Sequence, residues 1–239
     1  MAGRLNSIAR IFGIQVVKTS RLERLIGDAS LQHRISRTLI QQAKGVLHIG
    51  GHFGEEAGDY NALEKPVLWV EGVPEYFKVL VENINKFPRQ RALNYFLSDS
   101  YEISVPFYVT NNEGSSSSLL KLNEKNPFKG LEISDVLRVE TFCLNEIVSL
   151  KDIANYDHWI IDVQGAEMNV LKGASEYLKF AKTLVVECST YELYSTQAHF
   201  HQIADFLHGF GFIYLYPIPE DSHGDVIFVN TETKNLKFG

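Results

Sequence analysis

The segment from Val46 to Gly72 constrains the fold of this chain more than any other stretch. An apolar run, Val46–Ile49, precedes a glycine pair, and a second apolar run, Val67–Val70, ends on Glu71. Apolar runs separated by a glycine turn and a helix are typical of a βαβ unit in a parallel sheet. In such units the turn lets a ligand approach the backbone, and the acidic residue accepts hydrogen bonds from ribose hydroxyls. The segment therefore predicts a site for an adenosine-containing ligand, lined by Gly50, Gly51, Glu71 and Gly72.

The glycine run departs from the pattern of dinucleotide-binding turns. Those turns carry glycines spaced as GxGxxG, whereas here Gly50 and Gly51 are adjacent and the next glycine is Gly54. Glu56 and Asp59 would also lie in the first turns of the following helix, where their charge disfavours a pyrophosphate. A ligand with an adenosine and a zwitterionic tail fits this turn better than a dinucleotide. A nicotinamide-dependent oxidoreductase is the alternative.

Acidic residues also end two later apolar strands. Asp162 follows the run Trp159–Ile161, and Glu187 follows the run Thr183–Val186. The C-terminal ends of parallel strands meet at one edge, where open α/β sheets bind ligands. We therefore interpret Glu71, Asp162 and Glu187 as parts of one site rather than as solvated surface charges.

Other polar segments extend this candidate site. A strand over residues 92–97 ends in Ser98 and Asp99, and Asp99 could accept a hydrogen bond from the amine of adenine. His223 lies in a polar, glycine-flanked loop near the expected mouth of the site. The polar segment 111–130 is too long for an ordinary connection, so it is either a disordered loop or an active-site lid.

Composition limits the class of protein. The 239 residues suffice for one main domain, and contents of 45% hydrophobic and 22% charged residues are ordinary for a globular protein. The two cysteines, Cys143 and Cys188, form neither a disulfide framework nor a zinc spacing, which indicates a reducing compartment. No apolar run approaches the length of a membrane-spanning helix, and the N-terminus lacks the layout of a signal peptide. We therefore expect a cytoplasmic protein.

Charge is distributed unevenly along the chain. Residues 1–44 have a balance of +6, whereas the net charge of the whole chain is −6, so the remainder is strongly acidic. An acidic body argues against a nucleic-acid-binding surface. Apolar spacing predicts helices over 5–17 and 21–43, and we divide the chain into a basic helical extension, 1–44, and a main domain, 45–239. The extension could contact an anionic membrane surface, a partner protein or a second copy of the chain, or pack on its own acidic body.

The C-terminal segment distinguishes between doubly wound folds. A helix over residues 200–210 precedes two strands, 212–216 and 226–229, with only a loop between the strands. Consecutive strands without a helix between them form an antiparallel pair. A mostly parallel sheet that ends in such a pair departs from the dinucleotide-binding arrangement, and it favours the methyltransferase version of the doubly wound α/β fold.

From about residue 44 to residue 230 the chain resembles the FkbM-type S-adenosylmethionine-dependent methyltransferases. The most specific match is IDVQGAEMNVLKGA, which is similar to the family's D-x-E-G-A-E-x-x-x-L-x-G-A stretch; VLHIGGHFGEE, WVEGVPE, FLSDS, VETFCLNEIV, VVECS and DVIFVN support it. The resemblance implies methyl transfer to an oxygen of a sugar or small molecule, and a Rossmann-like sheet of seven strands, six parallel and one antiparallel. It also implies S-adenosylmethionine as the cofactor, which we assign to His48, Gly50, Gly51, Glu71, Gly72, Ser98, Asp99 and Asp162.

Two residues depart from the pattern of the family. Gln164 replaces the usual first Glu of the motif, and His48 stands where methyltransferases of this class usually carry an acid that supports the ammonium group of the cofactor. A neutral His accepts one hydrogen bond but lacks the charge, which is worth about 1–3 kcal/mol. Three readings follow: weaker cofactor binding, another task for His48, or a non-catalytic module of a biosynthetic complex.

Three residues are candidate catalytic groups, namely Asp162, Glu187 and His223. An acceptor hydroxyl must be aligned with the methyl group and must lose its proton as the new bond forms. Asp162 is the first candidate for the general base, and Glu187 is the second. Together they could hold Mg²⁺, because hard oxygen ligands suit this ion, but no third carboxylate follows Glu187, so a metal is not favoured.

Overall fold

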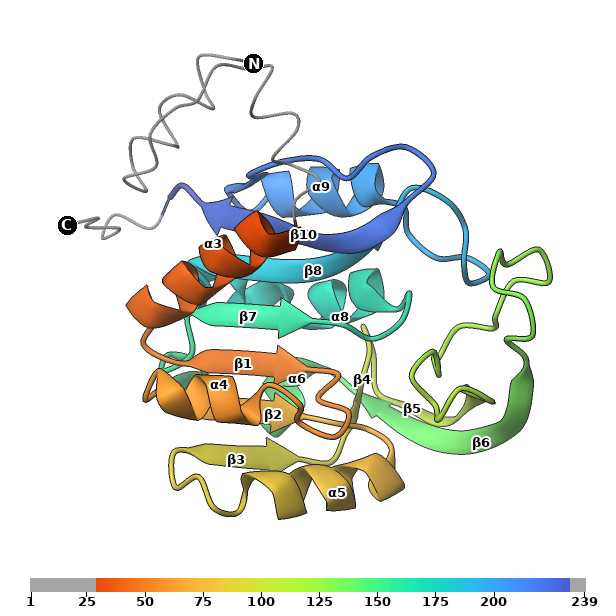
Figure 1. Cartoon of the computed structure of the whole chain (residues 1–239), viewed down its shortest axis with the longest axis horizontal. Coiled ribbons are helices and arrows are strands. Elements are labelled where there is room, and N and C mark those ends of the chain that lie inside the picture. The colour runs from red at the N-terminus through yellow and green to blue at the C-terminus, as the bar shows by residue number, and fades with distance from the viewer. Residues whose placement is uncertain (1–28, 233–239) are drawn as a thin grey trace.

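The central sheet has seven strands in the computed structural model, which describes residues 29–232 (Figure 1). Within this sheet of the described chain, β10 runs opposite to the other six strands, which share one direction. The predicted sheet with its C-terminal antiparallel hairpin is therefore confirmed. In order across the sheet the strands are β3 (Gln90–Leu93), β2 (Val67–Val70), β1 (Val46–Ile49), β7 (His158–Ile161), β8 (Thr183–Ser189), β10 (His223–Asn230) and β9 (Phe212–Tyr214).

Helices cover both faces of this sheet. Strands β1 and β2 are buried along their whole length, as expected for apolar strands with helices on both sides. The helices on one face are α3 (Ala29–Gln42), α4 (Ala57–Ala62) and α5 (Pro74–Ile84). Those on the other face are α6 (Leu144–Ile147), α7 (Leu150–Ile153), α8 (Glu167–Gly173), the 3₁₀ helix Ser175–Phe180 and α9 (Phe200–His208). The C-terminal ends of the parallel strands meet at one open edge (Figure 1).

Helix α3 is the described part of the N-terminal extension, and it packs on the sheet. Leu39 joins a buried cluster with Val185 and Ile227, and Ile40 joins the cluster that contains Trp69. The extension therefore packs on its own main domain through α3, one of the arrangements that the sequence left open. The helix predicted over residues 5–17 and the first part of the one over 21–43 lie outside the described residues.

A second, smaller sheet stands beyond the edge where β1 and β7 end (Figure 1). It contains β5 (Glu102–Thr110) and β6 (Ile133–Phe142) as an antiparallel pair, with β4 (Phe96–Leu97) parallel to β6. The single strand predicted over residues 92–97 is wrong, because the chain leaves the central sheet after β3 and then joins the small sheet. The Asn94 side-chain amide holds this bend by donating to the carbonyl oxygens of Glu71 (2.8 Å) and Gly72 (2.9 Å).

The connection between β5 and β6 is folded onto the body of the molecule. The Asn123 amide donates to the Leu193 carbonyl oxygen at 3.0 Å, and the Ser195 amide donates to the Lys121 carbonyl oxygen at 2.8 Å. Of the two roles left open by the sequence, these bonds favour a lid, and we call residues 111–130 the lid segment below. Within residues 29–232, no helix has both the length and the apolar character needed to span a bilayer.

Candidate active site

A cavity of about 320 Å³ opens where β1, β2 and β7 end, and we call it the first cavity. Its volume is within the range of small-molecule sites. The lid segment forms one wall through residues that include Ser115 and Ser117. Six of the predicted cofactor residues line it: His48, Gly50, Gly51, Glu71, Gly72 and Asp162.

The glycine turn is fixed by contacts within the protein. Gly50 has a positive φ of 85°, and a Cβ there would clash with the carbonyl oxygen of Asp162. A Cβ on Gly51 would lie 3.0 Å from the Trp69 ring. The sequence attributed both glycines to close approach of a ligand, whereas packing against β7 and β2 already requires them. The turn lines the cavity as a consequence of this packing.

Glu71 ends β2 with both carboxylate oxygens held by the backbone. Oε2 accepts from the His52 amide at 2.8 Å, and Oε1 accepts from the Val73 amide at 2.7 Å. Burial raises the pKa of Glu71, while these two hydrogen bonds act in the opposite direction. Each oxygen keeps further acceptor capacity toward the cavity. Glu71 is therefore a fixed acceptor for hydroxyl groups of a ligand.

The charge of the first cavity is negative. Glu55, Glu56, Glu71 and Asp162 line it, and its lining, which lies wholly within the described residues, contains no Lys or Arg. Helix α4 begins at Ala57, with Glu56 as its N-cap residue, and has only six residues. A pyrophosphate would meet carboxylates here, so the geometry counts against the nicotinamide-dependent alternative.

His48 is buried at the end of this cavity. Its Nδ1 lies 3.1 Å from the hydroxyl oxygen of Tyr60, and its ring stacks on Trp69 with 4.5 Å between centroids. Burial lowers the pKa of His48 to about 4, although the nearby Asp162 and Glu55 carboxylates oppose this shift. The imidazole is therefore neutral at physiological pH and cannot replace the negative charge of an acidic residue.

Three neighbouring strands carry carboxylates in register at the same edge. Asp225 on β10 pairs directly with Glu187 on β8. Asp162 and Glu187 each follow the register pair Ile161 and Val186 by one residue, so they are also neighbours. Glu187 lies within β8, which continues to Ser189, rather than after the strand as predicted. We call Asp162, Glu187 and Asp225 the carboxylate row.

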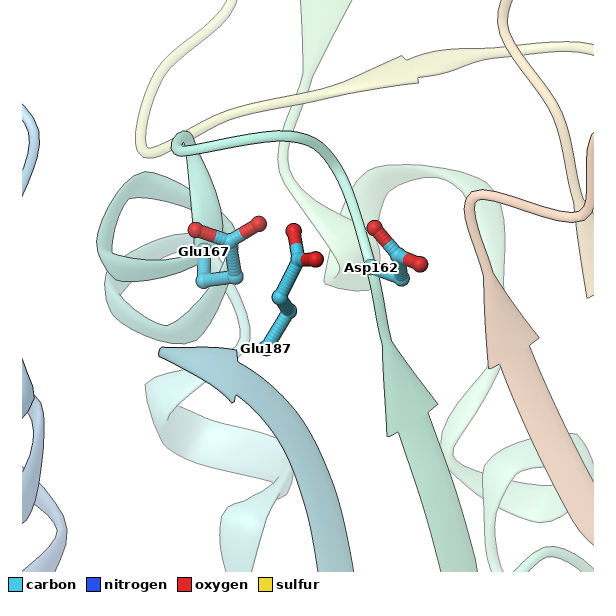
Figure 2. A group of neighbouring side chains, drawn as sticks. All are labelled: Asp162, Glu167 and Glu187. Atoms are coloured by element: carbon cyan, nitrogen blue, oxygen red, sulfur yellow. The ribbon is translucent and has the colours of Figure 1, made fainter. Parts of the chain in front are cut away.

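Glu167, from the start of α8, approaches the carboxylate row from the side. Figure 2 shows Glu187 between Glu167 and Asp162, and oxygens of these three residues lie within 4.8 Å of one another. Burial, and then the charges of Asp162, Glu167 and Asp225, raise the pKa of Glu187 to about 10. Burial also raises the pKa of Glu167 to about 7. Glu187 therefore holds a proton at neutral pH.

Gln164 connects these acidic residues. Its amide nitrogen donates to Asp162 at 2.6 Å and to Glu187 at 3.1 Å. Its oxygen lies 3.0 Å from the Tyr194 hydroxyl, which is also 3.1 Å from the Ser116 carbonyl oxygen of the lid segment. The hydroxyl has one proton, so it serves these two acceptors in alternation. A Glu at this position, as is usual in the resembling family, would add a further negative charge to the cluster.

Several predicted site residues lie away from the first cavity. Ser98 and Asp99 follow β4, bond to each other at 3.2 Å, and do not line the cavity. Glu187 is also absent from the lining and is reached through Gln164. His223 is exposed, and its Nδ1 lies 3.0 Å from the Tyr191 hydroxyl. The geometry therefore gives no support to a direct role for these four residues.

Other residues of the site were not predicted from the sequence. Tyr76, Ser115 and Ser117 line the first cavity, and Gly114 packs so closely on Tyr76 that a Cβ there would clash with the ring. The run of four serines in the lid segment was the available signal, but it does not indicate which serines face inward. Gln164 was noticed only as a departure from a motif, and its bridging position depends on its positive φ of 54°.

A family model and a curated relative both match this chain in sequence. The model of the FkbM methyltransferase domain matches residues 48–214. The 2-O-methyltransferase NoeI of Sinorhizobium fredii is 27% identical over 210 residues, which cover 84% of this chain and 85% of NoeI.

Solved structures also resemble the chain, at lower identity. A putative caffeoyl-CoA O-methyltransferase from Staphylococcus aureus has 14% identity and a TM-score of 0.48, with 95% of this chain and 91% of that chain covered. The magnesium protoporphyrin IX methyltransferase of Synechocystis, solved with S-adenosylmethionine, has 11% identity and a TM-score of 0.45, with 95% and 90% covered. The fold assignment rests on the strand order rather than on these two structures. The match of the domain model over most of the chain shows that this protein belongs to the FkbM methyltransferase family.

Proposed function

We propose that this chain transfers a methyl group from S-adenosylmethionine to a hydroxyl oxygen of a sugar or another small molecule. The observation that carries the proposal is the position of Glu71 and Asp162 on the lining of one cavity, with the glycine turn between their strands. The name of the relative NoeI, a 2-O-methyltransferase, favours oxygen as the acceptor atom.

The residues of the first cavity fit this cofactor. Glu71 presents fixed acceptors to a pair of ribose hydroxyls, and the negative lining suits a ligand that carries a sulfonium and an ammonium group. When bound, S-adenosylmethionine supplies a methyl group whose bond to sulfur breaks with the electron pair left on sulfur. The protein then has two tasks, which are alignment of the acceptor and removal of its proton.

Asp162 is the group that we assign to proton removal. It lines the cavity, and the amide of Gln164 orients its carboxylate through a hydrogen bond of 2.6 Å. Glu187, predicted as the second candidate, is protonated at neutral pH and therefore does not suit a general base. We assign it, with Gln164, to the positioning of Asp162.

We propose that the reaction needs no metal ion. Asp162, Glu167 and Glu187 are hard oxygen donors that could surround a cation by type. However, Gln164 donates to two of them, and the amides of Val163 and Gly165 donate to Glu167 at 3.1 and 2.9 Å. These donors and the proton on Glu187 already offset the charge of the cluster.

Calorimetric titration tests the cofactor assignment. S-adenosylmethionine, S-adenosylhomocysteine and NAD⁺ are titrated into the wild type, Glu71→Gln and the control Glu75→Gln, whose exposed side chain lies in the first turn of α5. We expect micromolar binding of the two sulfur compounds, weakened by about 10- to 100-fold in Glu71→Gln because charge-assisted hydrogen bonds are lost, and unchanged in the control.

Two other outcomes would change the assignment. Binding of NAD⁺ alone would overturn it. Binding of both sulfur compounds without methyl transfer to any hydroxylated acceptor would favour a non-catalytic module, a reading to which the neutral His48 also lends support.

A further inference from the structure

A second cavity, of about 380 Å³, lies on the face of the sheet that α3 and α4 cover. His48, Glu56 and Asp162 line both this second cavity and the first one. The two cavities therefore meet at the residue that we assign to proton removal. Ligands in the two cavities would therefore both contact Asp162.

The floor of the second cavity is a row of residues from four neighbouring strands. Ile160 is in register with His48 on β1 and with Val185 on β8, and Val185 is in register with Ile227 on β10. All four residues line the cavity. Ile160, Val185 and Ile227 give the floor an apolar surface that would suit the C–H face of a sugar ring.

The wall of this cavity contains a buried hydroxyl group without a partner. Tyr216 lines the cavity and is only 7% exposed, and its hydroxyl oxygen has no hydrogen-bond partner in the part of the chain that the structure describes. A buried polar group is costly unless it is hydrogen-bonded. A hydroxyl group of a ligand would satisfy Tyr216.

Charge restricts what the second cavity can hold. Four carboxylates line it, from Glu56, Asp59, Asp162 and Asp225. Arg37 is the only Lys or Arg among the lining residues, all of which are described, and it lies 4.0 Å from Asp59. Carboxylates accept hydrogen bonds from hydroxyl and ammonium groups but repel anions. The lining therefore favours a neutral or amine-bearing polyol over a phosphorylated or carboxylated one.

From these features we infer that the second cavity binds the methyl acceptor, as a neutral or amine-bearing glycosyl unit. The inference rests on the proposed methyl transfer. The acceptor oxygen forms its bond to the methyl carbon while the carbon–sulfur bond breaks, sulfur retains that electron pair, and the hydroxyl proton passes to the Asp162 carboxylate. His48, whose neutral ring lies at the junction, forms part of the wall between the two ligands.

Methyl-resolved NMR of the full chain, with ¹³C-labelled Ile, Leu and Val, tests this inference. Leu119 and Val163 line the first cavity alone, whereas Ile160, Val185 and Ile227 line the second alone. S-adenosylhomocysteine is added first and should shift the first pair. Methyl β-D-glucopyranoside, added to the saturated protein, should then shift the three methyl-bearing residues of the second cavity.

Matched probes and variants sharpen the test. Tyr216→Phe keeps the ring but removes the hydroxyl, so we expect it to weaken glucoside binding by about 5-fold, the usual effect of one hydrogen bond, and to leave S-adenosylhomocysteine binding unchanged. The exposed Tyr214→Phe, outside both cavities, is the control. The corresponding methyl glucosaminide should bind at least about 10-fold more tightly than the methyl glucuronide, because the carboxylates attract its ammonium group.

The outcomes separate the two proposals. If S-adenosylhomocysteine shifts neither Leu119 nor Val163, the proposed function itself fails. If it shifts them, but none of the three glycosides shifts Ile160, Val185 or Ile227, only the acceptor inference is overturned. Equal glucoside binding by the wild type and Tyr216→Phe would also overturn it.

Discussion

Acidic residues in the two halves of the open sheet edge differ in their hydrogen-bond donors and in the charges beside them. On β2, Glu71 receives one backbone N–H on each carboxylate oxygen. On β8, Glu187 lies in register with a carboxylate on each side and receives one side-chain amide hydrogen bond, from Gln164. Burial raises the pKa of both residues, but only for Glu187 do neighbouring acids carry it to about 10.

This difference shows that the position of a carboxylate at a strand end does not determine its role. Backbone donors stabilise the charged form, so Glu71 suits a ligand with hydroxyl donors. Neighbouring carboxylates disfavour the charged form, so Glu187 serves as a protonated support for Asp162. Four substitutions can break or sharpen this comparison.

Asp162→Asn should have the largest effect. The amide cannot take the hydroxyl proton, so we expect methyl transfer to fall by about 10²- to 10⁴-fold, the usual contribution of general base catalysis. Binding of S-adenosylhomocysteine should change by less than about 10-fold, since a neutral hydrogen-bonding group remains at the cavity. Steady-state kinetics on a glycoside acceptor and calorimetry measure the two effects. The exposed Asp221→Asn is the control, and a kcat within about 3-fold of wild type in Asp162→Asn would contradict the assignment.

Gln164→Glu should have the next largest effect. It removes the amide donors shared by Asp162 and Glu187 and adds a negative charge to a cluster of acidic residues. We expect the free energy of unfolding to fall by about 1–3 kcal/mol at pH 8, and by less at pH 5, where protons offset the charge. Mg²⁺ should restore part of the loss in the variant and leave the wild type unaffected.

Urea unfolding of Gln164→Glu at both pH values, with and without Mg²⁺, measures these effects. If Mg²⁺ stabilises the wild type equally, the cluster is a cation site as it stands, and the proposal that no metal is needed fails.

Glu187→Gln should stabilise the protein at high pH. Because the pKa of Glu187 is raised in the folded state, the folded chain binds more protons than the unfolded chain between pH 4.5 and about 10, so its stability falls as the pH rises through this window. The glutamine of the variant does not titrate, so the variant does not lose stability in this way as the pH rises. We expect it to exceed the wild type by about 1.4 kcal/mol or more at pH 8, and by little at pH 4.5.

Denaturant midpoints across this pH range check the expectation, with the exposed Glu192→Gln as the control. A Glu187→Gln protein that is less stable than the wild type at pH 8 would show that the charged carboxylate, rather than the protonated one, is the native form.

Tyr194→Phe should have the smallest effect. It removes the hydroxyl that lies between Gln164 and the Ser116 carbonyl oxygen, so we expect a loss of about 0.5–1.5 kcal/mol in stability. Hydrogen exchange of the amides of the lid segment should increase more than exchange elsewhere. The control is Tyr191→Phe, whose hydroxyl bonds to His223 outside the cavity. Equal exchange in both variants would mean that Tyr194 does not hold the lid segment.

Much of the fold could be predicted from local sequence patterns. The apolar runs of β1, β2, β7 and β8 were found because strands buried on both faces carry little else, and the antiparallel end of the sheet was predicted from two strands without a helix between them. The small sheet was missed because β4 contains only Phe96 and Leu97, and its separation from β3 depends on hydrogen bonds of Asn94 to a distant strand end.

The site was predictable where it depends on strand ends and not where it depends on packing. Glu71 and Asp162 were identified because parallel strands end at one edge. The protonated state of Glu187 required its neighbour Asp225, which comes from a strand added in the opposite direction, and no local pattern indicates that pairing. Ser98 and Asp99 were misplaced along with the strand that precedes them.

Helix α3 has a practical consequence for any shortened version of this protein. Removal of residues 1–44 would eliminate the buried side chains of Leu39 and Ile40 and strip Ser36 and Arg37 from the wall of the second cavity. If such a truncation lost activity or membrane contact, the cause could be a destabilised main domain. The result would then say nothing about the function of the basic N-terminal residues. Cutting before Ala29 instead separates the two questions, because it leaves the helix in place and removes four arginines and one lysine.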